Sequence, residues 1–124
     1  AAGVQAVFLL PGTTDPWAPK VVRSGMGSHF RLPILNWGIE ALEALLGDMR
    51  VYYADMNGET NYWQADFRVK TALLIGGEAD GASEQGRALA NTTVSIPMVG
   101  GTESLNAAVS AALLMFEVAR QRQV

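Results

Sequence analysis

The chain contains several short apolar runs that stay apolar along their length instead of alternating with polar residues. This pattern is typical of strands in a sheet that is covered on both faces. Stretches with helical spacing separate the runs, which favours βαβ units and a mostly parallel sheet. The predicted strands are Ala6 to Leu10, Arg50 to Asp55, Thr71 to Ile75 and Thr93 to Ile96, with a shorter extended piece at Leu32 to Ile34.

Helices are expected in the segments between the strands. Proline suits the first position of a helix, where no amide donor is needed, so a helix should begin at Pro19 and fade at Gly25. Asn36 is the expected N-cap of the next helix. The segments predicted after it are a helix at Trp37 to Leu46 with Gly47 as its stop, a loop at Glu59 to Arg68, a helix at Ser83 to Ala90 and a long helix from the N-cap Ser104 to about Arg120.

Length and composition limit the class of protein. A chain of 124 residues predicts a single domain, residues 1–124. The hydrophobic content of 49% and the net charge of −3 exclude an intrinsically disordered chain. The absence of cysteine and the single histidine, His29, exclude a disulfide scaffold and a zinc site of the usual kinds, so no metal is expected. No apolar stretch approaches the ~20 residues of a membrane span, and a cytoplasmic location without membrane contact is expected.

Glycine and proline gather at the ends of three predicted strands, at Pro11-Gly12, at Gly76-Gly77 and from Pro97 to Gly101. Ligands of parallel α/β sheets bind beyond the carboxyl ends of the strands. These positions therefore predict an α/β domain with a ligand cleft at one edge of the sheet. Neither G-x-x-x-x-G-K nor G-x-G-x-x-G follows a strand, which makes a generic nucleotide-binding protein a weaker interpretation.

Two of these strand ends belong to longer motifs, LLIGGEADG at 73–81 and IPMVGGTESLNAAV at 96–109. In order and spacing they resemble the second and third motifs of the SpoU-type (TrmH-like) RNA 2′-O-ribose methyltransferases of the SPOUT class. The family patterns are L-x-x-G-x-E-x-x-G and I-P-M-x-G-x-x-x-S-L-N-x-x-V-A. The segment Pro16 to Pro33 and the pair Phe116-Glu117 are also similar to the family, so the resemblance covers essentially the whole chain.

The resemblance implies a SPOUT-type α/β knot, with a mostly parallel sheet, helices on both faces and a deep trefoil knot near the C-terminus. It also implies that S-adenosylmethionine is the cofactor and that the protein is a homodimer with the cofactor site near the subunit interface. The implied reaction transfers a methyl group to a ribose 2′-hydroxyl of rRNA or tRNA.

Site residues follow from the same resemblance. Gly76, Ile96, Met98 and Leu105 would contact the cofactor, and Glu78, Ser104 and Asn106 would be catalytic. Glycine lets the backbone approach a ligand closely, and the start of a helix offers unpaired amides. A 2′-hydroxyl is a poor nucleophile until its proton is removed or shared. Without the motifs, Gly76-Gly77-Glu78 would be only a tight turn, and Ser104 and Asn106 would be ordinary cap or turn residues.

Basic and aromatic residues outside the motifs have two interpretations each. Lys20, Arg23 and Arg31 would bind RNA phosphates, or they would form a solvated helix face. The three tryptophans would stack on bases, or they would bury area in the core or in a dimer interface. A structural or surface role is expected for His29, which has no identified catalytic partner. The tryptophans are Trp17, Trp37 and Trp63.

The first motif of the family, an N-x-G-x-x-x-R-T-like segment, would lie directly before Ala1. Its arginine is expected to help activate the 2′-hydroxyl. The chain begins without methionine and runs straight into a predicted strand, so we expect the sequence to be a fragment truncated at its N-terminus. The alternative function is a non-catalytic cofactor- or RNA-binding module that acts by dimerisation. Finding the first motif immediately upstream would favour the enzyme.

Overall fold

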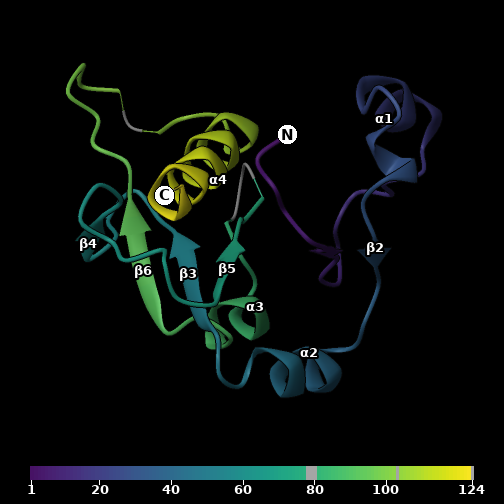
Figure 1. The fold of residues 1–124 in the computed structure, drawn as a ribbon, viewed down its shortest axis with the longest axis horizontal. Coiled ribbons are helices and arrows are strands. Elements are labelled where there is room, and N and C mark those ends of the chain that lie inside the picture. Colours follow the sequence, from purple (N-terminus) through teal and green to yellow (C-terminus); the bar gives the residue numbers. More distant parts are fainter. Residues whose placement is uncertain (78–80, 103, 124) are drawn as a thin grey trace.

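A computed structural model describes residues 1–77, 81–102 and 104–123 (Figure 1). Every strand pair in its named sheets is parallel. The four-stranded sheet has the order β4-β6-β3-β5, and β1 and β2 form a separate two-stranded pair. The strands are β1 (Val7–Phe8), β2 (Ile34–Leu35), β3 (Arg50–Ala54), β4 (Thr60–Asn61), β5 (Thr71–Leu74) and β6 (Thr92–Ser95).

The helices are distributed unevenly about the four-stranded sheet (Figure 1). The longest helix, α4, lies over one face of that sheet, and residues 1–46 lie to its right in Figure 1 with α1 at the far side. Tyr53 of β3 faces away from the core beneath α4 and contacts Arg87 of α3. The helices are α1 (Pro19–Ser24), the 3₁₀ turn η1 (Ser28–Phe30), α2 (Ile39–Leu46), α3 (Glu84–Ala88) and α4 (Ala107–Arg122).

The predicted α/β class and the parallel strands are confirmed, but the strands differ in extent. The strand expected at Ala6 to Leu10 is only Val7–Phe8, because its partner β2 is equally short. β2 directly follows Pro33, which has no amide hydrogen for a ladder. The segment from Glu59 to Arg68, expected to be a loop, contains β4. The sheet is also divided into two parts, which the apolar runs did not predict.

Two predicted helix caps are wrong. The N-cap of α2 is Gly38 and not Asn36. Trp37 stays outside that helix, where its ring packs edge-to-face on Phe8 with a centroid separation of 5.2 Å. The N-cap of α4 is Asn106 and not Ser104, since the Asn106 Oδ1 accepts hydrogen bonds from the amides of Ala108 (2.8 Å) and Val109 (3.3 Å). Both expected caps have suitable side chains, but the path of the chain places them before the helix.

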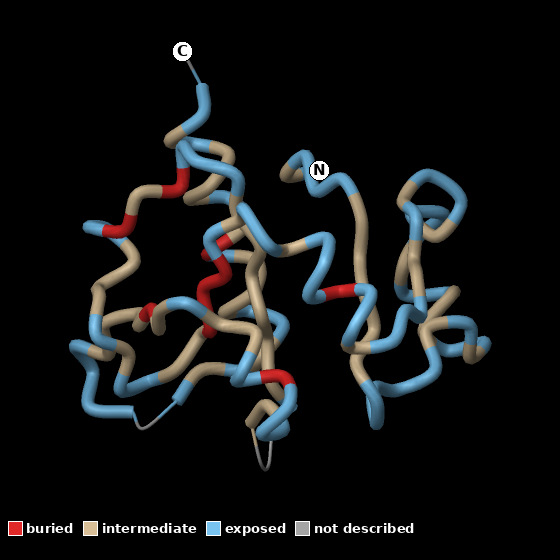
Figure 2. The backbone as a smooth tube through the Cα atoms, turned by 90° about the horizontal axis from the view of Figure 1, so that it is seen from below, coloured by how far each residue is buried: buried red, intermediate tan, exposed pale blue. Residues whose placement is uncertain are grey.

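The main hydrophobic core lies between α4 and the four-stranded sheet. Leu114 of α4 and Phe67 are both fully buried there, beside Val94 of β6. The rings of Tyr52 and Phe67 meet edge to face at 4.8 Å. Figure 2 shows that the buried positions form short separate segments of the chain, and among residues 1–46 only Leu42 is buried.

The tryptophans lie outside this core. Trp17, Trp37 and Trp63 are 51%, 40% and 62% exposed. The expectation that they fill the core is therefore wrong, whereas base stacking and burial in an interface with another chain stay as predictions. His29 has a structural contact, because its Nε2 lies 2.7 Å from the Pro16 carbonyl oxygen and its ring packs near Trp17.

The last turn of α4 binds the backbone of segment 65–69 through side-chain hydrogen bonds. The Gln121 side chain donates to the Ala65 carbonyl (2.9 Å) and accepts from the Phe67 amide (2.7 Å). Arg122 donates to the carbonyls of Phe67 (2.9 Å) and Val69 (2.7 Å). The same Gln121 amide also donates to Glu117, so this carboxylate helps to orient the glutamine that holds the segment.

Glu117 should make the stability of the fold sensitive to acid. Hydrogen bonds from Arg120 and then from Gln121 hold the pKa of Glu117 below its ordinary value. A carboxyl group whose pKa is lower in the folded chain stabilises the fold above its unfolded pKa, about 4.3. That contribution is lost as the pH falls through the lower folded value. We therefore expect Glu117→Gln to reduce the urea midpoint at neutral pH and to show a smaller further loss below about pH 4 than the wild type.

Urea unfolding followed by circular dichroism at neutral and acidic pH measures this difference. Glu43→Gln on the exposed surface of α2 is the matched control and should keep the wild-type loss of stability in acid. Parallel stability curves for the wild type and Glu117→Gln would contradict the assigned role of this carboxylate.

Candidate cofactor site

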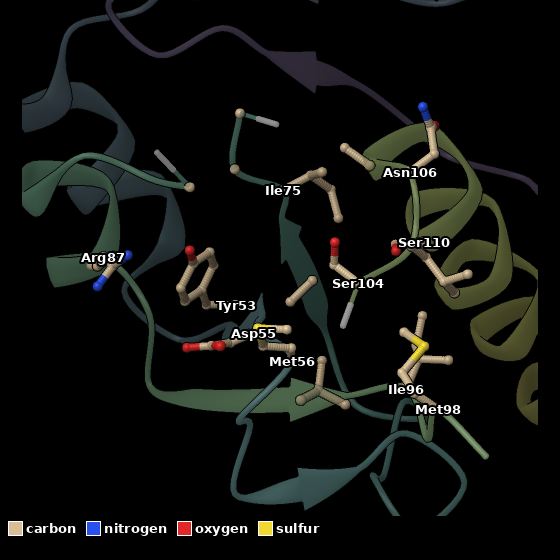
Figure 3. Close-up of a pocket in the computed structure, with 17 residues that line it drawn as sticks. Tyr53, Asp55, Met56, Ile75, Arg87, Ile96, Met98, Ser104, Asn106 and Ser110 are labelled. Carbon is tan, nitrogen blue, oxygen red and sulfur yellow. The ribbon is translucent and has the colours of Figure 1, made fainter. Parts of the chain in front are cut away.

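A cavity of about 550 Å³ opens at the carboxyl ends of β3, β5 and β6 (Figure 3). Its walls come from the ends of these strands and the residues that follow them, from Arg87 of α3 and from the first turn of α4. Parallel α/β sheets place their ligands at this edge, and the volume is within the range of small-molecule sites. The predicted ligand cleft therefore has a counterpart in the structure.

The cavity brings together residues from both sequence motifs. Of the predicted cofactor-binding and catalytic residues, Glu78 lies outside the described residues. Pro11-Gly12 does not line the cavity, because β1 lies in the separate strand pair. The predicted residues that line it are Gly76, Ile96, Met98, Ser104, Leu105 and Asn106.

The three predicted RNA-binding cations do not line this cavity. Lys20 and Arg23 lie on α1, and Arg31 directly follows η1. All three side chains are exposed, and Figure 1 places α1 on the opposite side of the molecule from β4 and β6. Any ligand that contacts both α1 and the cavity must therefore be large.

Gly76 is required by a close approach of two backbone segments. The amide of Gly77 donates to the Gly81 carbonyl, and the amide of Gly81 donates to the Gly77 carbonyl, both at 3.1 Å. A Cβ on Gly76 would lie 2.5 Å from the Ala82 nitrogen and 2.5 Å from the Gly81 carbonyl carbon. Only glycine fits this position without moving the backbone that forms the cavity wall.

Asn106 and Ser104 come from the segment that leads into α4. The Asn106 carboxamide caps the helix through its Oδ1 and so holds the first turn, whose Ala107 also lines the cavity. In Figure 3 the Ser104 and Ser110 side chains lie on the α4 side of the cavity, near Ile75. This side of the cavity combines hydroxyl groups with apolar side chains.

The sequence motifs missed the residues on the opposite side, Tyr53, Asp55 and Arg87. The Tyr53 hydroxyl accepts a hydrogen bond from the Ala82 amide (3.2 Å), and the Arg87 Nε donates to the Ala82 carbonyl (3.2 Å). Tyr53 and Asp55 lie at the end of β3, where a parallel sheet places ligand-binding residues. Their position at a strand end could have identified Tyr53 and Asp55 from the sequence, whereas nothing in the sequence indicated Arg87.

A comparison with protein-family models decides the family. The model described as the SpoU rRNA Methylase family matches residues 1–116. The chain belongs to this family. The resemblance carried by the motifs at 73–81 and 96–109 is therefore confirmed.

Similar SpoU proteins are longer than this chain. The 23S rRNA (uridine(2479)-2′-O)-methyltransferase of Streptomyces viridochromogenes is 37% identical, over 98% of this chain and 45% of the relative. The 23S rRNA (guanosine-2′-O-)-methyltransferase RlmB of Xylella fastidiosa (strain 9a5c) is 35% identical, over 98% of this chain and 50% of the relative. The chain thus spans about half the length of these curated relatives.

Solved SpoU structures share the fold of this chain. The crystal structure of the SpoU methyltransferase AviRb from Streptomyces viridochromogenes, in complex with the cofactor AdoMet, superimposes with a TM-score of 0.86 at 36% identity. The match covers 98% of this chain and 51% of AviRb. Within the described parts of the SpoU chain, no helix has the length and apolar character needed to span a membrane.

Alanine at Gly76 and at Gly77 should have different effects. Gly76→Ala forces its Cβ into the backbone of 81–82, so we expect a loss of about 1–3 kcal/mol in the free energy of unfolding and weaker ligand binding in the cavity. Gly77→Ala is the matched control, because the nearest atom to its Cβ is 3.7 Å away. Thermal unfolding compares the two variants, and equal stability would refute the tight contact at Gly76.

Proposed function

We propose that this chain is the cofactor-binding part of an RNA methyltransferase that uses S-adenosylmethionine to methylate a ribose 2′-hydroxyl of rRNA or tRNA. The observation that carries the proposal is the meeting of six predicted cofactor-binding and catalytic residues in one cavity at the carboxyl edge of the sheet. The curated relatives named above are rRNA 2′-O-methyltransferases, and AviRb binds AdoMet. Both facts support the enzyme over a non-catalytic module.

The cavity suits S-adenosylmethionine in size and chemistry. Ile75, Ile96 and Met98 provide apolar walls for a flat base, and Gly76 lets the backbone approach closely. Backbone groups and hydroxyls near the start of α4 provide polar partners. When bound, S-adenosylmethionine supplies an electrophilic methyl group on its sulfonium.

The chain's own residues would align and activate the nucleophile. We assign to Ser104 the orientation of the ribose through its hydroxyl, which both donates and accepts hydrogen bonds. Glu78 would accept or share the proton of the 2′-hydroxyl. Asn106 would hold the first turn of α4 and thereby the position of Leu105. Alignment of two bound reactants provides much of the rate in such a transfer.

We assign RNA-phosphate binding to Lys20, Arg23 and Arg31. All three are exposed, and none forms an ion pair with a residue in the described part of the chain. Lys20 and Arg23 are three positions apart on α1, so they share one helix face. Both positive charges attract a polyanion that contacts this face. The net charge of −3 over the whole chain does not prevent this local attraction.

Titration calorimetry with S-adenosylmethionine, with ATP as the control ligand, tests the cofactor site. We expect selective binding of S-adenosylmethionine. Transfer of labelled methyl groups from the cofactor to rRNA and tRNA tests the reaction, and a 2′-O-methylated linkage is recognised by its resistance to alkaline hydrolysis. Binding of cofactor and RNA without methyl transfer, also after an N-x-G-x-x-x-R-T-like segment is fused before Ala1, would favour the non-catalytic module.

We also propose a homodimer that forms through α4. Val109, Leu113 and Phe116 are 48%, 39% and 55% exposed and follow each other at helical spacing. This apolar stripe lies on the helix that carries the cavity residues Ala107 and Ser110. A dimer through it would bring the cavity close to the second subunit, and exposed apolar stripes of this kind mark interaction surfaces.

Leu113→Glu should convert the dimer into a monomer, because it places a charge within the apolar stripe. Sedimentation velocity measures the mass of the particle. Leu45→Glu is the matched control, since Leu45 is 42% exposed on α2 and should leave the dimer intact. A wild-type monomer, or a dimer that survives Leu113→Glu, would refute this interface.

We further infer the trefoil knot near the C-terminus. The support is the family motifs together with the path of the chain, which leaves β6, crosses the sheet and continues into α4 in contact with β5. A crystal structure of this chain would test the knot, because it would show whether this crossover is threaded.

A further inference from the structure

One side of the cavity carries two opposite charges that belong to neither motif (Figure 3). Asp55 directly follows β3, and Arg87 extends from α3. In Figure 3 they are grouped with Tyr53, whereas Ile96, Met98, Ser104 and Asn106 lie on the other side. The cavity therefore has a charged side and a side built from apolar and hydroxyl groups.

Contacts with Tyr53 and Ala82 hold Arg87 in place. Its guanidinium carbon lies 5.4 Å from the centroid of the Tyr53 ring, and its Nε donates to the Ala82 carbonyl (3.2 Å). Among the residues that the structure describes, no carboxylate forms an ion pair with Arg87, and its two terminal nitrogens have no hydrogen-bond partner. With respect to the described residues, both nitrogens are available as hydrogen-bond donors to a ligand.

Asp55 is positioned in a similar way. Its amide donates to the Val94 carbonyl (3.0 Å), which fixes the backbone between β3 and β6. Its Oδ1 accepts a hydrogen bond from the Asn57 amide (3.0 Å). No cation among the described residues pairs with the carboxylate, so Asp55 and Arg87 face the same cavity without pairing with each other.

A separated carboxylate and guanidinium complement a ligand that carries an ammonium and a carboxylate group. The α-amino-acid end of S-adenosylmethionine has this pair of charges. We propose that Asp55 accepts hydrogen bonds from the α-ammonium of the cofactor and that Arg87 donates to its α-carboxylate. This inference rests on the proposed function and assigns the adenosyl part to the apolar side, near Ile96 and Met98.

The two charges together favour this ligand over an RNA phosphate. Arg87 alone would attract a phosphate, but the Asp55 carboxylate in the same cavity repels a group that is only negative. A zwitterion satisfies both side chains. Hydrogen bonds between charged partners are also stronger than those between neutral groups, so each of these two contacts should be measurable.

Calorimetry with three related ligands tests the assignment. S-adenosylmethionine has the whole amino-acid end, decarboxylated S-adenosylmethionine lacks only the carboxylate, and 5′-methylthioadenosine lacks the entire amino-acid end. Arg87→Gln should lower the affinity for S-adenosylmethionine about tenfold and leave the affinities for the other two ligands unchanged. Asp55→Asn should lower the affinities for S-adenosylmethionine and its decarboxylated form about equally. It should leave the affinity for 5′-methylthioadenosine unchanged.

The matched controls are Arg68→Gln and Glu43→Gln, which remove exposed charges away from the cavity and should bind all three ligands as the wild type does. Thermal unfolding of each variant shows whether it is folded. Arg87→Lys keeps the charge but loses the planar fork, and should recover part of the affinity for S-adenosylmethionine.

Four results would overturn the assignment. If Asp55→Asn and Arg87→Gln lose as much affinity for 5′-methylthioadenosine as for S-adenosylmethionine, the two residues shape the adenosyl site. An unchanged affinity of Asp55→Asn and Arg87→Gln for S-adenosylmethionine would refute the subsite, and a loss of RNA affinity alone in Arg87→Gln would identify a phosphate site. If the folded wild type does not bind S-adenosylmethionine, the proposed cofactor site itself fails and the subsite with it.

Discussion

The packing of α4 across the sheet is the contact on which the rest of this structure depends. Leu114 is fully buried beside Tyr52, Phe67 and Val94, and the last turn of the helix binds the backbone of 65–69 through Gln121 and Arg122. The segment from Ile96 to Asn106 joins β6 to this helix. Because both of its ends are held, Ile96 and Leu105 reach the same cavity.

The turn that begins at Gly76 completes the cavity from the neighbouring strand. β5 and β6 both pair with β3, so the residues that follow them leave the sheet at the same edge. The bonds between Gly77 and Gly81 join these two residues, and the bond from the Ala82 amide to the Tyr53 hydroxyl holds Ala82 near the end of β3. The missing side chain at Gly76 makes this approach possible.

The charges on this SpoU chain are distributed over separate surfaces. Lys20, Arg23 and Arg31 lie on the α1 side, whereas Asp55 and Arg87 lie in the cavity. The net charge of −3 is a sum over the whole chain and does not give the charge of either surface. The proposed binding of RNA at α1 and of S-adenosylmethionine in the cavity would benefit from this separation, because a purely basic cavity would also attract phosphate.

The sequence by itself determined the α/β class, the parallel strands and the motif residues of the cavity. Uniformly apolar runs reveal buried strands, and the order of the glycine, proline and asparagine positions identified the family. Only the tertiary structure decided that Asn106 and not Ser104 caps α4, that the tryptophans are exposed, and that Tyr53, Asp55 and Arg87 share a cavity with the motifs. For the cavity residues the physical reason is distance along the chain: the contacts of Tyr53 with Ala82 and Arg87 join residues about thirty positions apart, and local spacing contains no information about which strand ends meet. For the cap, both Ser104 and Asn106 suit the role, and the path of the chain into α4 decides between them.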